Sequence, residues 1–117
     1  MSYSESMLRD VVFYQTSVDK IPHFDFVDSL KDVKTRALIA DRIDRARFGN
    51  FGNHKGVGEG VFELVIDYGP GYRVYYALDG RTVIVILTGS DKSDQRETIK
   101  KAKLFWSDYK ARKTTRK

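Results

Sequence analysis

The sequence GNFGNHKGVGEG (residues 49–60) precedes the run VFELVIDY (61–68) and the segment GPGYR (69–73). Glycine adopts backbone conformations with positive φ and lets a ligand or another backbone approach closely. The alternation of apolar and polar residues in 61–68 predicts a strand with one buried and one more open face. Gly69-Pro70-Gly71 then turns the chain into a second strand, with Arg73 near its start. We predict that this loop, strand, turn and strand form a basic surface beside a small sheet.

Further strands are predicted on either side of this unit. Val11–Gln15 is a short β-branched and aromatic run, and the apolar run 83–87 is typical of a central strand buried on both faces. Asp79-Gly80 is a strong hairpin signal before that central strand. Side chains alternate between the two faces of a strand, a pattern with a period of two residues. This period of two assigns one set of side chains to the core, namely Phe62, Leu64, Ile66, Tyr68, Val74, Tyr76 and Leu78. It assigns the alternate set to the open face, namely Glu63, Val65, Asp67, Arg73, Tyr75 and Ala77.

Three helices complete the predicted domain. Pro22 opens the first, Asp32 caps the second, and Gly49 ends the second helix. Gly89-Ser90-Asp91 is predicted to end the last strand and to cap the final helix. The order β-α-α-β-β-β-α indicates a single α+β domain over residues 1–117, with a twisted, mainly antiparallel four-stranded sheet packed with helices. Residues 1–10 and 112–117 are expected to be flexible.

Charge and composition narrow the function. The chain of 117 residues has a net charge of +5, and from Lys92 onward ten basic residues face three acidic ones. This asymmetry favours a polyanionic or an acidic protein partner, or else indicates a solvated helix face. The chain has no cysteine and no apolar run long enough to span a bilayer, and its start lacks a signal-peptide pattern. We therefore expect a cytoplasmic protein without membrane contact, metal or cofactor.

Several cations are predicted to gather at one edge of the sheet. Preorganised Arg and Lys side chains stabilise the extra negative charge that develops on a phosphate during phosphodiester transfer, and aromatic rings commonly stack on single-stranded RNA bases. Tyr75 and Tyr68 are the candidates for stacking. The alternative is a surface ion pair of Arg73 with Glu63 or Asp67. The candidate cations are Arg73, Lys55, His54, Lys92 and Arg96.

A run of matching segments resembles one protein family over about Val11 to Tyr109. The segments are Ile43-Asp44-Arg45, Gly49-Asn50-Phe51-Gly52, Lys55, Gly58-Glu59-Gly60-Val61, Glu63-Leu64, Tyr68-Gly69-Pro70-Gly71-Tyr72-Arg73-Val74-Tyr75 and Gly89-Ser90-Asp91-Lys92-Ser93-Asp94-Gln95. In this order they resemble the HigB-like "addiction module killer protein" branch of the RelE/ParE toxin superfamily. The resemblance implies the toxin of a type II toxin–antitoxin system, a ribosome-dependent mRNA endoribonuclease that blocks translation. It also implies three partners: a cognate antitoxin of helix-turn-helix type in a hetero-oligomer, the ribosome, and mRNA.

The resemblance also assigns roles to individual residues. Arg73 matches the superfamily arginine after the Gly-Tyr turn. Lys55 matches the family's loop lysine, and Lys92 matches the lysine of its Asp-Lys-x-x-Gln segment. The resemblance implies that these three residues are catalytic. Gln95 matches the glutamine of that segment. The expected substrate-binding residues are Tyr75, His54, Gln95 and Arg96.

One position departs from the family pattern. The branch has Glu-Leu-Arg where this chain has Glu63-Leu64-Val65, so Val65 removes a cation from the expected site. Two alternatives therefore stay open. One is a ParE-like toxin that inhibits DNA gyrase by protein binding, and the other is an inactive relative that binds an antitoxin.

Overall fold

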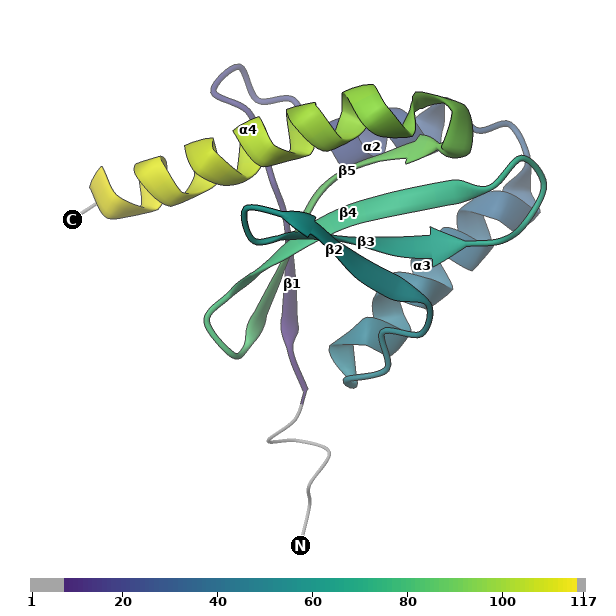
Figure 1. Ribbon diagram of the computed structural model, residues 1–117, viewed down its shortest axis with the longest axis horizontal. Coiled ribbons are helices and arrows are strands. Elements are labelled where there is room, and N and C mark those ends of the chain that lie inside the picture. Colours follow the sequence, from purple (N-terminus) through teal and green to yellow (C-terminus); the bar gives the residue numbers. More distant parts are fainter. Residues whose placement is uncertain (1–7, 116–117) are drawn as a thin grey trace, which may run out of the picture.

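A five-stranded sheet with helices on both faces forms the body of the protein in a computed structural model that describes residues 8–115 (Figure 1). The elements follow the chain as β1 (Asp10–Phe13), α2 (Pro22–Asp28), α3 (Val33–Arg47), β2 (His54–Gly58), β3 (Val61–Ile66), β4 (Tyr72–Asp79), β5 (Val83–Asp91), a short 3-10 turn (Lys92–Asp94) and α4 (Gln95–Thr115). The α+β class is thus confirmed. No helix within the described residues is long and apolar enough to cross a membrane.

The sheet contains one strand more than the predicted four. Its order is β1-β5-β4-β3-β2, with β1 parallel to β5 and every other pair antiparallel. The additional strand is β2, which lies inside the glycine-rich stretch expected to be a loop. Glu59 and Gly60, with φ of 57° and 84°, form the tight turn that folds β2 back onto β3. The glycines therefore permit a hairpin there rather than an open loop.

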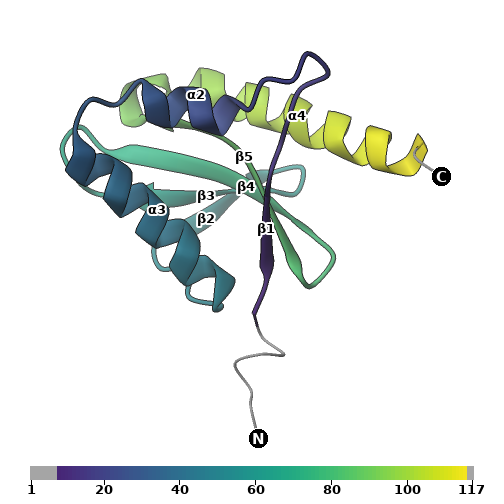
Figure 2. The ribbon, with the colours of Figure 1, turned by 180° about the vertical axis from the view of Figure 1, so that it is seen from behind.

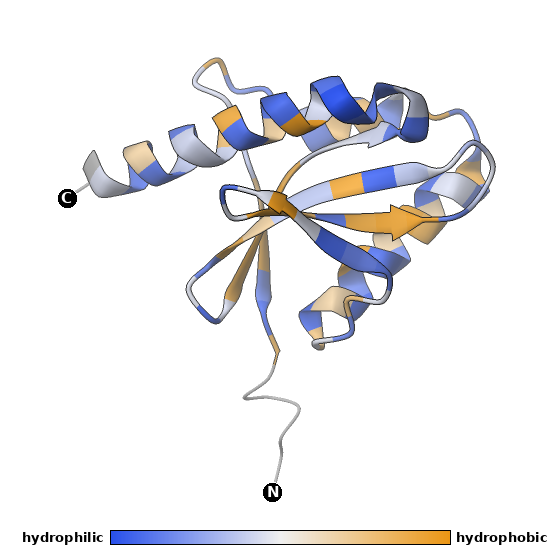
Figure 3. Ribbon diagram, viewed as in Figure 1, coloured by the Kyte–Doolittle hydropathy of each residue, from blue (hydrophilic) through white to orange (hydrophobic). Residues whose placement is uncertain are grey.

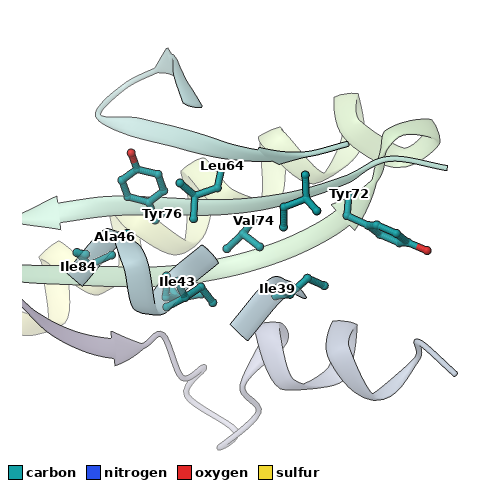
Figure 4. Packing of buried hydrophobic residues seen from close by; sticks show 10 residues of the cluster. Ile39, Ile43, Ala46, Leu64, Tyr72, Val74, Tyr76 and Ile84 are labelled. Carbon is teal, nitrogen blue, oxygen red and sulfur yellow. The ribbon is translucent and has the colours of Figure 1, made fainter. Parts of the chain in front are cut away.

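The first core lies between the sheet and α3. Figure 4 shows α3 side chains meeting those of β3, β4 and β5. Val74 and Tyr76 lie in this core, as period two predicts, whereas Phe62, Tyr68 and Leu78 are only partly buried against it. Its buried members are Ile39, Ile43, Ala46, Leu64, Ile66, Tyr72, Val74, Tyr76, Ile84 and Ile86. Figure 2, seen from behind, shows α2 and α3 covering this face.

The second core lies on the face that period two assigned to open solvent. Helix α4 covers this face (Figure 1), and Tyr75 and Ala77 are fully buried beneath it. Ala102 and Trp106 of α4 are buried in the same cluster, while Ile99, Phe105 and Tyr109 pack against it. The apolar side chains of α4 therefore cover this face of the sheet. Figure 3 shows that the first turns of α4 are hydrophilic.

Local signals fix most helix boundaries. Pro22 is the first residue of α2, and Asp32 caps α3 by accepting a hydrogen bond from the Lys34 backbone N–H at 3.1 Å. Gly49, with φ of 89°, follows the end of α3. As predicted, β5 ends at Asp91, and Asp91 caps the helical segment that follows. The first turn of that segment is a 3-10 turn (Lys92–Asp94), and α4 continues from it at Gln95.

Parts of the two ends that were expected to be flexible form regular structure. Asp10 is the first residue of β1, and residues 112–115 continue α4. The remainder of both predicted segments, residues 1–7 and 116–117, lies outside the described residues.

Candidate functional site

A buried carboxylate stands at the centre of the candidate site. Glu63 of β3 has no exposed surface, although period two assigned it to an open face. Three side chains from three other elements surround it. Gln95, the first residue of α4, donates from Nε2 to both carboxylate oxygens, at 3.0 Å to Oε1 and 3.2 Å to Oε2. Buried charges persist when partners compensate them, so these neighbours account for the position of Glu63.

Two predicted cations flank Glu63. Lys55 Nζ lies 3.6 Å from Glu63 Oε2, and Arg73 Nε lies 3.7 Å from the same oxygen. The strand register explains this convergence, because Lys55 is paired with Glu63 across β2 and β3 and the next strand supplies Arg73. The side chain of Lys55 is 65% exposed, whereas that of Arg73 is 10% exposed. The charge of Lys55 thus remains available to a ligand from solvent.

Arg73 is held tightly but not fully satisfied. Its Nη1 donates to the Tyr72 carbonyl oxygen at 3.3 Å. Its buried Nε has no hydrogen-bond acceptor within residues 8–115, because the 3.7 Å contact with Glu63 is an ion pair longer than a hydrogen bond. Buried unsatisfied donors are uncommon in folded proteins and cluster where a ligand or a catalytic role explains them. The ion pair with Glu63 is the alternative that the sequence had left open.

A small cavity lies beside Arg73 at the turn between β3 and β4. Its volume is about 320 Å³, and its lining combines cations, one acid and an aromatic ring: Asp67, Tyr68, Gly69, Pro70, Gly71, Arg73 and Lys92. The Lys92 backbone N–H donates to the Gly71 carbonyl oxygen at 2.9 Å, which brings the start of the 3-10 turn against the Gly-Pro-Gly turn. Arg73 and Lys92, both predicted catalytic residues, therefore share one cavity.

Arg42 of α3 fixes the loop that leads into β2. Its guanidinium donates to the carbonyl oxygens of Val65 at 2.5 Å and of Phe51 and Asn53 at 3.0 Å each. Burial lowers the pKa of Arg42 from its ordinary value, and the nearby Arg45 charge lowers it further. Because Asn53 immediately precedes β2, these bonds hold the strand that carries Lys55. The spacing of Arg42 along its helix gives no sign of this role.

Other predicted residues do not join the cluster. His54 pairs with Leu64 and so points to the opposite face from Lys55, where its Nδ1 lies 2.9 Å from the Gly52 carbonyl oxygen. Arg96 is exposed on α4 and shows no hydrogen bond or ion pair within the described part of the chain. The structure thus gathers Lys55, Arg73, Lys92 and Gln95, but not His54 or Arg96.

Tyr75 does not present a stacking surface. Its ring is fully buried beneath α4, and its hydroxyl lies 3.4 Å from Ser90 Oγ. Burial raises the pKa of Tyr75 to about 12, against the lowering effect of the Ser90 hydrogen bond. The expectation that Tyr75 stacks on a base was wrong, because the face assumed open is covered by α4. Tyr68, the other aromatic candidate, lines the cavity at the turn.

Val65 lies directly across from Arg73. The two residues are paired in the β3–β4 register, so their side chains share one face. Val65 is half-buried, and an arginine at this position would project beside Arg73. The departure from the family pattern therefore falls next to the cluster.

Glu63 itself was missed as a site residue. Period two correctly placed its side chain on the same face as Arg73, but that face was taken to be open. The available signal was Glu59-Gly60, because a hairpin turn at these residues brings Lys55 opposite Glu63. No group of three or more potential metal-ligating His, Cys, Asp or Glu residues occurs within the residues that the structure describes.

Comparison with known proteins identifies a bacterial relative. No protein-family model matches the chain. A protein of Haemophilus influenzae (strain ATCC 51907 / DSM 11121 / KW20 / Rd), described as an uncharacterized protein, is 47% identical over 80 residues. The match covers 68% of this chain and 81% of the relative.

Proposed function

We propose that this chain, which belongs to the same family as the Haemophilus influenzae protein, is an RNA-cleaving toxin. In this proposal the protein is the toxin of a type II toxin–antitoxin system of the RelE/ParE superfamily, HigB-like branch. It acts in the cytoplasm as a ribosome-dependent mRNA endoribonuclease, and a helix-turn-helix antitoxin neutralises it in a hetero-oligomer. The observation that carries the proposal is the convergence of Lys55, Arg73 and Gln95 on Glu63, with Lys92 beside Arg73.

The geometry supports stabilisation of a reacting phosphate. When the ribose 2′-hydroxyl loses its proton and attacks the adjacent phosphate, a P–O2′ bond forms, the P–O5′ bond breaks, and the departing 5′-oxygen takes up a proton. Negative charge accumulates on the phosphate oxygens during this exchange. Arg73 is fixed by Glu63 and by the Tyr72 carbonyl oxygen, so it needs little reorganisation to meet that charge. Lys55 and Lys92 are exposed and bring further positive charge to the same region, with Lys55 paired to Glu63. Cleavage would thus depend on preorganised cations, with Glu63 positioning two of them.

In vitro translation of a defined mRNA tests this function. New 5′ ends mapped by primer extension are expected only when the mRNA is translated in the presence of the protein. Lys92→Ala is expected to reduce cleavage at least about tenfold, because one phosphate-stabilising cation is lost. Arg73→Ala is expected to reduce it about a hundredfold or more. Lys31→Ala, at an exposed lysine between α2 and α3, serves as the matched control and should cleave as the unchanged protein does.

Folding must be measured beside cleavage in this experiment. Arg73→Ala leaves Glu63 with less compensation, so the variant is compared with the unchanged protein by thermal unfolding, and Arg73→Lys is added to retain the charge. Lys92 is exposed, and its substitution leaves the sheet intact. Intact mRNA at full translation, with folded protein in excess, would overturn the proposed nuclease.

The second candidate function is gyrase inhibition by a ParE-like toxin. The observation that favours it is Val65 opposite Arg73, which leaves the site with one cation fewer than the family pattern provides. Gyrase supercoiling in the presence of saturating protein tests this candidate, and unimpaired supercoiling would exclude it. A protein that affects neither assay but still binds its antitoxin would be the inactive relative.

A further inference from the structure

We propose that the cavity at the β3–β4 turn is a nucleotide subsite that selects guanine, an inference that rests on the proposed RNA function and specifies its substrate. The cavity combines two cations, Arg73 and Lys92, with one carboxylate, Asp67, and with the ring of Tyr68. A ligand that fits this lining carries an anion and hydrogen-bond donors in the same small molecule. A nucleotide has this composition, with a phosphate and the amino or imino groups of a base.

The phosphate end of the cavity is defined by Arg73 and Lys92. Arg73 is about nine-tenths buried and lines the cavity, and its Nε faces Glu63 Oε2 at 3.7 Å. Gly71 keeps this end open, because a Cβ added there would lie 3.5 Å from Lys92 Cβ and 3.6 Å from Arg73 Nη1. Glycine is also required by the φ of 88° at this position. The turn thus leaves space for an anion where any side chain would partly fill it.

The base end is defined by Asp67 and Tyr68. Tyr68 is half-buried and lines the cavity, and Lys34 Nζ lies over its ring, 5.4 Å from the centroid. Aromatic side chains commonly stack on unpaired RNA bases. Asp67 is exposed and forms no ion pair among residues 8–115, so both of its carboxylate oxygens can accept hydrogen bonds from a ligand.

The carboxylate decides which base fits. Unpaired bases in RNA are read by hydrogen bonds on their Watson–Crick edges. Guanine presents two adjacent donors there, N1–H and the N2 amino group, and these match the two acceptor oxygens of Asp67. Adenine and cytosine each offer one amino group beside a ring acceptor, which a carboxylate would face unfavourably. Uracil offers a single imino donor between two carbonyl oxygens. The lining therefore favours guanine over the other three bases.

Direct binding of mononucleotides tests this subsite without ribosomes or cleavage. The four nucleoside 3′-monophosphates are titrated into the purified protein, and the backbone amide resonances of residues 67–73 are followed by NMR. Guanosine monophosphate is expected to bind about fivefold or more tightly than the other three, because a good bidentate contact to a base discriminates by at least about that much. Asp67→Asn is expected to reduce the preference to about twofold or less. Asp41→Asn, at an exposed acid of α3 outside the cavity, should retain the full preference.

The outcomes separate this inference from the proposed nuclease. Equal affinities for all four nucleotides, or a guanine preference that survives Asp67→Asn, would overturn the subsite. Guanosine binding that depends on Asp67, together with intact mRNA in the translation assay, would support the subsite and reject the nuclease. If the mRNA is cleaved without any bias toward guanine and the four nucleotides bind with equal affinities, the subsite is rejected and the proposed nuclease is retained.

Discussion

Glu63 is an acidic residue that positions the basic side chains around it. Its carboxylate is fully buried, and Lys55, Arg73 and Gln95 reach it from β2, β4 and α4. The attraction draws two cations to within 4 Å of one oxygen, where their mutual repulsion would otherwise separate them. The acid therefore determines the geometry of the cations that meet a ligand.

Removal of the Glu63 charge should destabilise the protein. Glu63→Ala is expected to lower the free energy of unfolding by about 3 kcal/mol, because the nearly buried Arg73 loses its compensating charge. Glu97→Ala is the matched control, since its ion pair with Lys100 lies at the surface and contributes less than about 1 kcal/mol. Urea denaturation of both variants measures the difference. Equal losses for Glu63→Ala and Glu97→Ala would contradict the central role of Glu63.

His23 should make stability depend on pH. Its side chain is 4% exposed and stacks on Phe13 at 5.5 Å between ring centroids, and burial lowers its pKa to about 4. Between pH 6.5 and pH 4 the unfolded chain therefore binds more protons at His23, so the free energy of unfolding falls as the pH falls through this range. At pH 4.5 the loss is expected to be about 2–3 kcal/mol relative to pH 7.

Replacement of the imidazole isolates this contribution. His23→Leu should unfold with a shallower pH dependence between pH 7 and pH 4.5 than the unchanged protein, because carboxylates titrate equally in both chains. Urea denaturation at the two pH values gives the comparison. Parallel pH profiles would mean that His23 accepts a proton in the folded state without a penalty.

At the scale of elements, Gly89 sets the distance between α2 and the sheet. A Cβ at Gly89 would lie 2.4 Å from Phe26 Cδ2 and 2.5 Å from Phe26 Cε2, and 3.0 Å from the Arg73 carbonyl oxygen. The ring of Phe26 thus rests directly on the backbone of β5. The sequence suggested that Gly89 ends a strand, but the residue lies inside β5. A glycine is needed there because the Phe26 ring of α2 occupies the space that a side chain would fill.

A methyl group at this contact should loosen α2. Gly89→Ala is expected to lower the free energy of unfolding by about 1–3 kcal/mol, because the Phe26 ring must leave its position. A second substitution, Phe26→Leu, should recover part of this loss. Gly56→Ala is the control on β2, where a Cβ would lie 3.6 Å from the Phe62 ring in ordinary contact. Chemical denaturation distinguishes these variants, and equal stabilities for Gly89→Ala and Gly56→Ala would contradict the proposed contact.

The helices were predictable because their signals are local. Pro22, Asp32 and Gly49 act on neighbouring backbone groups, and the structure uses all three at helix ends. Strand β2 was missed because its glycines are more typical of a loop, while its hairpin depends on pairing with β3. The parallel pairing of β1 with β5 joins residues 10–13 to residues 83–86, and no local pattern specifies such a partner.

At the scale of the whole molecule, the site was predicted in part. The positive side chains Lys55, Arg73 and Lys92 were found from residue type and order, and the fold brings them to one region. The sequence did not show that α4 covers the Arg73 face, so Tyr75 was placed in solvent and Glu63 was considered only as a surface ion-pair partner of Arg73. Which face a helix covers depends on packing between distant segments, and a strand pattern alone carries no information on it.

The parallel pairing of the first and last strands also bears on the order of synthesis. Chains emerge from the ribosome beginning at the N-terminus, and contacts between distant residues form only when both partners are present. β5 lies between β1 and β4, so the sheet remains in two unconnected parts until β5 has been translated. Lys92 and Gln95 are translated later still. A growing chain therefore lacks the assembled cation cluster until Lys92 and Gln95 have been translated, and β2, β3 and β4 are synthesised before the site that they help to form exists.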